Sequence, residues 1–127
     1  MRRSVFLLAA LCCAACSPKP DIIQVGPWFP PKSVRDVPVF SSREETSRPW
    51  GAIAIIHSER FPADDRSALD GQMRLARKLA AGAGADGVII AEEAVTEEPG
   101  LNGVRPPEAF ISALAFKYVT DISTSTR

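Results

Sequence analysis

The chain has no cysteine after Cys16, a single histidine and no excess of charge of either sign. Without cysteine, the part of the chain beyond residue 16 forms no disulfide within itself, so its folding rests on burial of apolar side chains. Basic and acidic residues number 15 each. This balance argues against a nucleic-acid partner and against a basic face that binds anionic lipid. With 127 residues, 46% of them hydrophobic, the chain can form one domain with a core.

The amino-terminal residues have the features of an export signal. Arg2 and Arg3 form a positively charged start, and residues 5–15 form an apolar run. This run is too short to cross a bilayer, which takes about 20 residues, but it suits the core of a signal peptide. We therefore expect residues 1–15 to direct export of the chain.

Two alanines stand directly before Cys16, and this arrangement resembles the bacterial lipobox. The resemblance implies cleavage before Cys16, a diacylglycerol thioether on its sulfur and acylation of the new amino terminus. The third position before the cysteine, usually leucine, is Cys13 here. Ser17 follows the cysteine in place of aspartate, which under the Gram-negative sorting pattern implies the outer membrane and a periplasmic domain. The alternative is a conventional secretory signal cleaved among alanines.

Residues 16–36 are expected to be a tether between the lipid and the domain. Proline fixes φ and removes a hydrogen-bond donor, so the many prolines here argue against a helix or a central strand. At ~3.1 Å per residue, such a tether could hold the domain ~60 Å from the membrane. Trp28 and Phe29 are unusual in a bare spacer. They either pack on the domain or dock a partner that has an aromatic groove.

The folded domain is expected over residues 37–120, with a polar tail at 121–127. Residues 37–40 suggest a short strand, and the apolar, β-branched run at 51–57 suggests a buried one. A helix then starts at Asp64 or Asp65, either of which can cap it. Its apolar residues recur every three or four positions, as in an amphipathic helix: Leu69, Met73, Ala76, Leu79, Ala80 and Ala83.

Beyond the helix, residues 88–91 predict a further buried strand and residues 93–107 a long loop. Residues 109–119 alternate as a strand would, although Pro107 could also open a helix there. The order β-β-α-β-β predicts an α+β fold, in which a small sheet of about four strands packs on one amphipathic helix.

A strand followed by an amphipathic helix that ends in Gly-Ala-Asp-Gly-Val-Ile, residues 84–89, is similar to small bacterial domains of the YbjQ/RcsF-like type. The resemblance covers roughly residues 37–119. It implies a small α+β domain and, in its RcsF-like branch, a lipoprotein that senses envelope stress through protein partners. Members of that branch carry disulfides, whereas the domain of this chain has no cysteine. The other branch carries a metal-binding label, for which this sequence has no ligand motif.

Three patterns could carry chemistry. Gly82, Gly84 and Gly87 match the dinucleotide fingerprint letter for letter, but they close a helix instead of opening one, so we expect no nucleotide. His57 and Glu59 could form a metal or acid–base pair, although one histidine without cysteine falls short of a usual zinc set. An acidic group lies beside the long loop and lacks the calcium-loop spacing: Glu92, Glu93, Glu97 and Glu98.

We therefore predict a lipid-anchored envelope lipoprotein that binds a protein partner or senses stress, and not an enzyme. Its membrane contact is the lipid on Cys16, and it is expected to need no metal or other cofactor. The first candidates for contact with an envelope protein are Trp28, Phe29, Asn102 and Arg105. One alternative is a small metal-dependent hydrolase centred on His57 and Glu59, with the Glu92/Glu93 cluster nearby. Another is a purely structural envelope lipoprotein.

Overall fold

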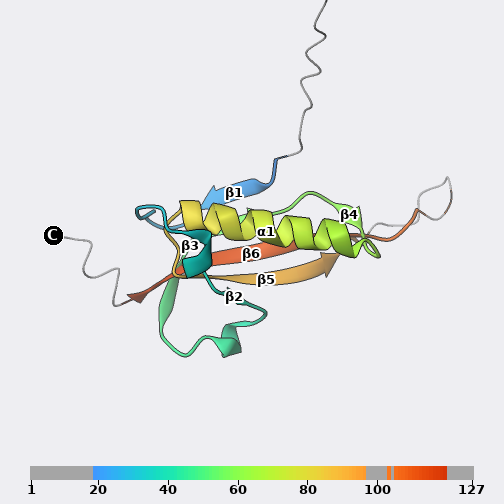
Figure 1. The fold of residues 1–127 in the computed structure, drawn as a ribbon. Coiled ribbons are helices and arrows are strands. Elements are labelled where there is room, and N and C mark those ends of the chain that lie inside the picture. The colour runs from blue at the N-terminus through green and yellow to red at the C-terminus, as the bar shows by residue number, and fades with distance from the viewer. Residues whose placement is uncertain (1–18, 97–102, 104, 120–127) are drawn as a thin grey trace, which may run out of the picture.

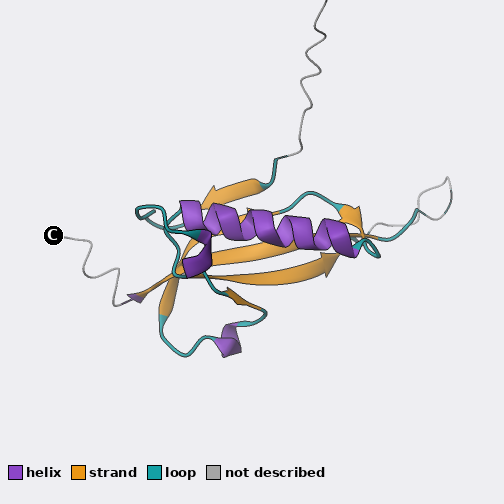
Figure 2. Ribbon diagram, viewed as in Figure 1, coloured by secondary structure: helices purple, strands orange, loops and turns teal. Residues whose placement is uncertain are grey.

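The computed structural model describes residues 19–96, 103 and 105–119. In this part of the chain one helix covers one face of a six-stranded sheet (Figure 1, Figure 2). The predicted α+β class is confirmed, but the sheet has six strands instead of four. The elements are β1 (Asp21–Gln24), β2 (Val39–Phe40), β3 (Trp50–His57), β4 (Phe61–Pro62), α1 (Arg66–Gly82), β5 (Gly87–Ala94) and β6 (Glu108–Tyr118), with 3-10 turns η1 (Val34–Asp36) and η2 (Arg43–Glu45).

The sheet has the strand order β1-β3-β6-β5-β2, and β4 pairs with the beginning of β6. All pairings are antiparallel except that of β2 with β5. Residues 109–119 could have formed a strand or a helix, and residues 109–118 of them belong to β6, the long central strand. β1 therefore lies at one edge of the sheet, and β5 with the short β2 lies at the other (Figure 1).

The expected tether at residues 16–36 is wrong from Asp21 onward. β1 pairs with β3 from Asp21 to Gln24, and the backbone N–H groups of Phe29 and Lys32 donate to Ala83 and Ala81 at the end of α1, at 3.0 and 2.9 Å. The prolines did not prevent this, because an edge strand needs hydrogen-bond donors on one side only and Pro20 and Pro27 flank β1 without entering it. The domain thus begins at β1 and not at residue 37.

The helix begins and ends where the local signals predict. The side chain of Asp65 caps it by accepting a hydrogen bond from the Ala68 N–H at 3.0 Å. At the other end Gly84 has φ +76°, and the N–H groups of Gly84 and Ala85 donate to Ala81 and Ala80, both at 3.0 Å. These bonds satisfy carbonyl groups that the helix end would leave open. None of the described helices is long and apolar enough to cross a membrane.

The core lies between α1 and one face of the sheet. Alternate residues of a strand point to opposite faces, and the residues of β6 that face α1 are buried together with apolar residues of β3 and β5. Small alanine side chains on α1 let the helix approach the sheet closely. The main members of this core are Ile53, Ile56, Ala76, Ala80, Val88, Ile90, Ile111, Ala113 and Ala115.

An aromatic cluster packs on the other face of the sheet, at the end where β6 finishes. Phe116, with 0% of its surface exposed, lies 5.0 Å from Trp50, 5.5 Å from Tyr118 and 5.8 Å from Phe40, measured between ring centroids. Arg43 and Arg48 of the intervening loop stack on the rings of Trp50 and Tyr118 (5.2 and 4.0 Å to the centroids). The loop after β2 therefore closes this end of the face.

Two glycines of the helix region give a matched stability test. A Cβ on Gly84 would lie 2.7 Å from backbone atoms of Phe29 and would sit at positive φ, whereas a Cβ on Gly71 would meet nothing within 4 Å. We expect Gly84→Ala to lower the free energy of unfolding by about 2 kcal/mol or more. We expect Gly71→Ala to raise it by up to about 1 kcal/mol through helix propensity. Urea unfolding measures both, and equal changes would contradict the assigned packing of Phe29.

Candidate functional site

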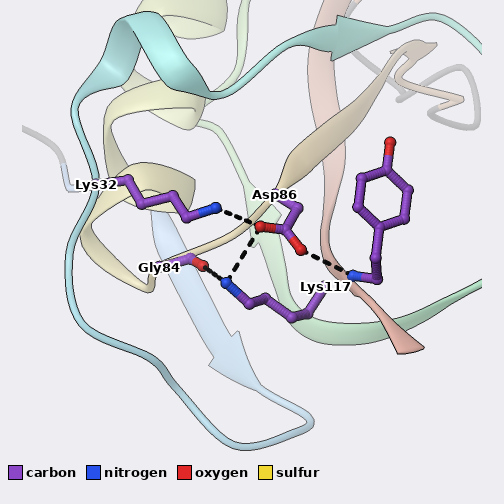
Figure 3. Close-up of polar contacts among 5 residues, drawn as sticks. Lys32, Gly84, Asp86 and Lys117 are labelled. Atoms are coloured by element: carbon purple, nitrogen blue, oxygen red, sulfur yellow. Dashed lines mark hydrogen bonds and ion pairs between the residues drawn. The ribbon is translucent and has the colours of Figure 1, made fainter. Parts of the chain in front are cut away.

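A charged cluster joins the amino-terminal segment to the junction between α1 and β5 (Figure 3). The carboxylate of Asp86 accepts hydrogen bonds from the amino groups of Lys32 and Lys117, the latter at 3.1 Å, and from the backbone N–H of Tyr118 at 2.9 Å. The Lys117 amino group also donates to the carbonyl oxygen of Gly84 at 3.1 Å. Asp86 and Lys117 are 8% and 7% exposed, so this is a nearly buried ion pair with a second, half-exposed lysine beside it.

Two opposing effects act on the pKa of Asp86. Burial alone would raise it, but the hydrogen bonds from Lys32, the Tyr118 N–H and Lys117 together outweigh burial and lower the pKa to about 2. Asp86 is therefore ionised at any physiological pH. Its two oxygens are both hydrogen-bonded within the protein, as expected for a group that holds structure together instead of exchanging protons with a substrate.

Phe29 shares this junction. Its ring is partly buried against the core and lies 4.8 Å below the Lys117 amino group. The Gly-Ala-Asp sequence at 84–86 therefore has a physical role at each residue. Gly84 ends the helix and leaves room for Phe29, Ala85 is fully buried, and Asp86 binds both lysines. The cluster fastens residues 29–32 to the domain.

The outer edge of β5 differs from this fully bonded junction, because part of the edge lacks a neighbouring strand. The Val88 N–H donates to Pro38 on the β2 side at 3.1 Å, whereas the Val95 N–H donates to Glu108 of β6 at 2.9 Å. Backbone groups alternate in direction along an antiparallel strand. Glu92 and Ala94 therefore direct their N–H and C=O groups outward, as Val88 does.

The pairing of β2 with β5 stops at Ile89. Within the described residues no strand lies beside the second half of β5, and residues 91–94 are all exposed. Figure 1 shows this half of β5 projecting past β2 along the lower edge of the sheet. An edge with unpaired backbone groups is a template for an added strand. We call residues 91–94 the free edge.

Glu92 and Glu93, which belong to the acidic group predicted beside the long loop, are separated in the structure. Glu92 and Glu93 are neighbours in β5, so their side chains point to opposite faces of the sheet. Glu92 pairs with Arg66 at the start of α1, at 3.4 Å, while Glu93 lies on the face away from the helix. Glu97 and Glu98 lie outside the described residues.

The predicted pairing of His57 with Glu59 is not supported by the strand geometry. β3 ends at His57, so the alternation that would place both side chains on one side does not continue to Glu59. The His57 ring instead contacts the edge of Phe110, with 6.2 Å between ring centroids. Across the described part of the chain, no three histidine, cysteine, aspartate or glutamate side chains gather to hold a metal ion.

The predicted contact residues are separated. Trp28 is 46% exposed and its indole N–H donates to the Ile53 carbonyl at 3.3 Å, whereas Phe29 is packed as described above. Both lie at the end of the sheet where β6 finishes, and exposed Arg105 precedes the start of β6 at the opposite end. Cys16 and Asn102 fall outside the described residues. Trp28 and Arg105, both described, therefore lie at opposite ends of the sheet.

No protein-family model and no curated protein matches this sequence. Among solved structures, the crystal structure of a Francisella virulence factor, FvfA, is similar, with a TM-score of 0.54. The two sequences are 17% identical, and the match covers 78% of this chain and 97% of that chain. At this identity the likeness concerns the fold alone.

Proposed function

We propose that the chain is a lipid-anchored envelope lipoprotein whose domain binds an extended segment of a partner protein along the free edge. The anchor is the lipid on Cys16, and the outer membrane with its periplasmic side is the proposed location. The observation that carries the binding role is the free edge itself. Unpaired N–H and C=O groups in register recognise another polypeptide backbone, and partners that add a strand to a sheet bind in this way.

The arrangement of the sheet supports this role for an anchored protein. The anchor joins the domain at β1, and the strand order puts β3 and β6 between β1 and β5. With strands ~4.8 Å apart, the free edge lies ~14 Å across the sheet from the anchored edge. A partner in the periplasm can therefore reach it without crossing the lipid-proximal side. The connection containing Asn102 and Arg105 directly follows the free edge and supplies further contacts.

The charge of the free edge favours a basic partner segment over a second copy of this chain. Glu92 and Glu93 occupy its middle. Two copies paired antiparallel about these residues would place like charges opposite each other, which destabilises a strand pair. A lysine- or arginine-containing segment would instead gain an opposite-charge pair with Glu93, while Glu92 keeps its pair with Arg66.

Proline at Ala94 tests this proposal. A photo-reactive residue at position 91 is expected to cross-link one envelope protein in living cells, and the same residue at Asp70, on the exposed side of α1, is not. Ala94→Pro removes an outward N–H without breaking a bond to β6, so we expect the cross-link yield at 91 to fall about tenfold. Ala94→Ser keeps the N–H and should leave the yield unchanged. Equal yields in the proline and serine variants would refute recognition through this edge.

A further inference from the structure

Large apolar side chains gather on the anchored edge of the sheet. Six of them are exposed in the described part of the chain, and three of these lie within residues 23–28. Ile23, Val25 and Trp28 are 45%, 48% and 46% exposed. The other three are spread over distant positions: Val34, Val39 and Val119. We call Ile23, Val25 and Trp28 the edge patch.

One carbonyl group holds the edge patch together. The backbone N–H groups of Val25 and Gly26 and the indole N–H of Trp28 all donate to the Ile53 oxygen, at 3.1, 3.2 and 3.3 Å. Ile53 lies at the irregularity in the β3–β6 pairing between Ala52 and Ala54. Ile23 lies in β1 opposite Ile55, and Val25 follows the end of that strand by one residue. The Trp28 indole is thus held at the same carbonyl as the Val25 N–H, with its own N–H already bonded.

The chain between the anchor and β1 is short. Only residues 17–20 separate Cys16 from Asp21, the first residue of β1. Even fully extended, those five steps along the chain span at most about 18 Å. This is far less than the ~60 Å expected from a tether that reached residue 36. A lipid on Cys16 would therefore hold β1 next to the bilayer surface.

We infer that the edge patch rests in the interfacial region of the bilayer that holds the Cys16 lipid. This inference rests on the anchor proposed above. It makes β1 the membrane-facing edge of the domain and leaves the free edge of β5 pointing away from the lipid. The anchor then fixes the orientation of the domain as well as its location.

The chemistry of the edge patch suits lipid. Tryptophan is enriched at membrane interfaces, where its ring contacts both apolar and polar surroundings. The indole N–H of Trp28 is bonded to Ile53, so moving the ring into a drier environment leaves no donor unpaired. Lys19 and Asp21, the charged residues at the start of this edge, offset each other. Contact through the edge patch should therefore depend little on lipid charge.

Fluorescence quenching tests this inference. Trp28 and Trp50 are the two tryptophans of the chain, so Trp50→Phe leaves Trp28 as the single probe. The chain as purified from cells is reconstituted in phosphatidylcholine vesicles with or without brominated acyl chains. A ring held ~5–10 Å into the headgroup–acyl boundary lies near the bromines, and we expect its fluorescence to fall about twofold. Adding phosphatidylglycerol should change this little. Trp28→Phe, which leaves Trp50 in the aromatic cluster, is the matched control and should not be quenched.

Flotation of the same vesicles tests the lipid anchor separately from the membrane contact of the edge patch. Chain that floats, with Trp28 quenched and Trp50 unaffected, supports the inference. Chain that floats with Trp28 unquenched overturns it while the anchor stands, and the edge patch is then open to a protein. Chain that does not float overturns the anchor, and the inference falls with it. Equal quenching of both tryptophans also overturns it, because the domain would then have no preferred membrane-facing edge.

Discussion

Asp86→Ala is expected to lower the free energy of unfolding by about 3–5 kcal/mol, because removing one partner of a buried ion pair leaves the other charge uncompensated. Lys117, with 9% of its side chain exposed, would keep only the Gly84 carbonyl as a partner in the cluster. The amino-terminal segment would also lose its side-chain attachment through Lys32. Urea unfolding followed by circular dichroism measures the change.

Two variants control this experiment. Asp70→Ala removes a carboxylate from the exposed side of α1 and should change stability by no more than about 0.5 kcal/mol. Asp86→Asn keeps the shape of the side chain and removes its charge, so it should still be strongly destabilising. A loss as small as that of Asp70→Ala in both Asp86 variants would show that the cluster does not stabilise the fold.

The pH dependence of the stability of Asp86→Asn provides a second test of the same cluster. The pKa of Asp86 is lowered from 3.8 to about 2 in the folded protein. A lowered carboxyl pKa contributes stability that is present above the unfolded-state pKa and is lost as pH falls through the folded-state pKa. The free energy of unfolding of the wild type should therefore exceed that of Asp86→Asn by a constant amount above about pH 4. This difference should shrink by on the order of 2 kcal/mol as the pH falls to about 2.

Phe116→Ala is expected to destabilise the domain by a similar amount, about 3–5 kcal/mol. The side chain is fully buried, three aromatic rings surround it, and a Cβ on Gly87 would lie 2.5 Å from its ring. Its removal leaves a cavity that the rigid sheet beneath cannot close. Thermal unfolding should show a large drop in Tm.

Phe110→Ala is the matched control for that variant. Phe110 lies on the same strand and the same face of the sheet, but it is only partly buried. Its loss should therefore cost clearly less than that of Phe116. If both variants lose the same stability, the aromatic cluster around Phe116 is not the packing centre of this face.

The helix and the long strands could be predicted because their signals are local. Asp65 and Gly84 mark the ends of α1 within one turn, and β3 and residues 88–91 of β5 are continuous apolar runs. β1 and β4 could not be predicted, because each is short and is defined as a strand only by its pairing with β3 or β6. The prolines around β1 indicated a spacer, and only its pairing with β3 shows otherwise.

The candidate sites were harder to predict than the fold, because they depend on contacts between distant residues. Asp86 is 54 residues from Lys32 and 31 from Lys117. A lysine inside an otherwise apolar strand was the one available signal, since a buried lysine needs a partner. The free edge depends on where β2 stops, which no local pattern records. Trp28 and Phe29, treated as one motif, have different roles because one is bonded at the edge and the other is packed at the junction.

The membrane-facing edge and the outward free edge both depend on the proposed anchor on Cys16. Mass spectrometry of the amino-terminal peptide from the membrane fraction tests it most directly. We expect a mature chain that starts at Cys16, carries diacylglycerol on its sulfur and leaves the membrane fraction in Cys16→Ser. A mature chain that starts elsewhere, with Cys16 removed or unmodified, would contradict it.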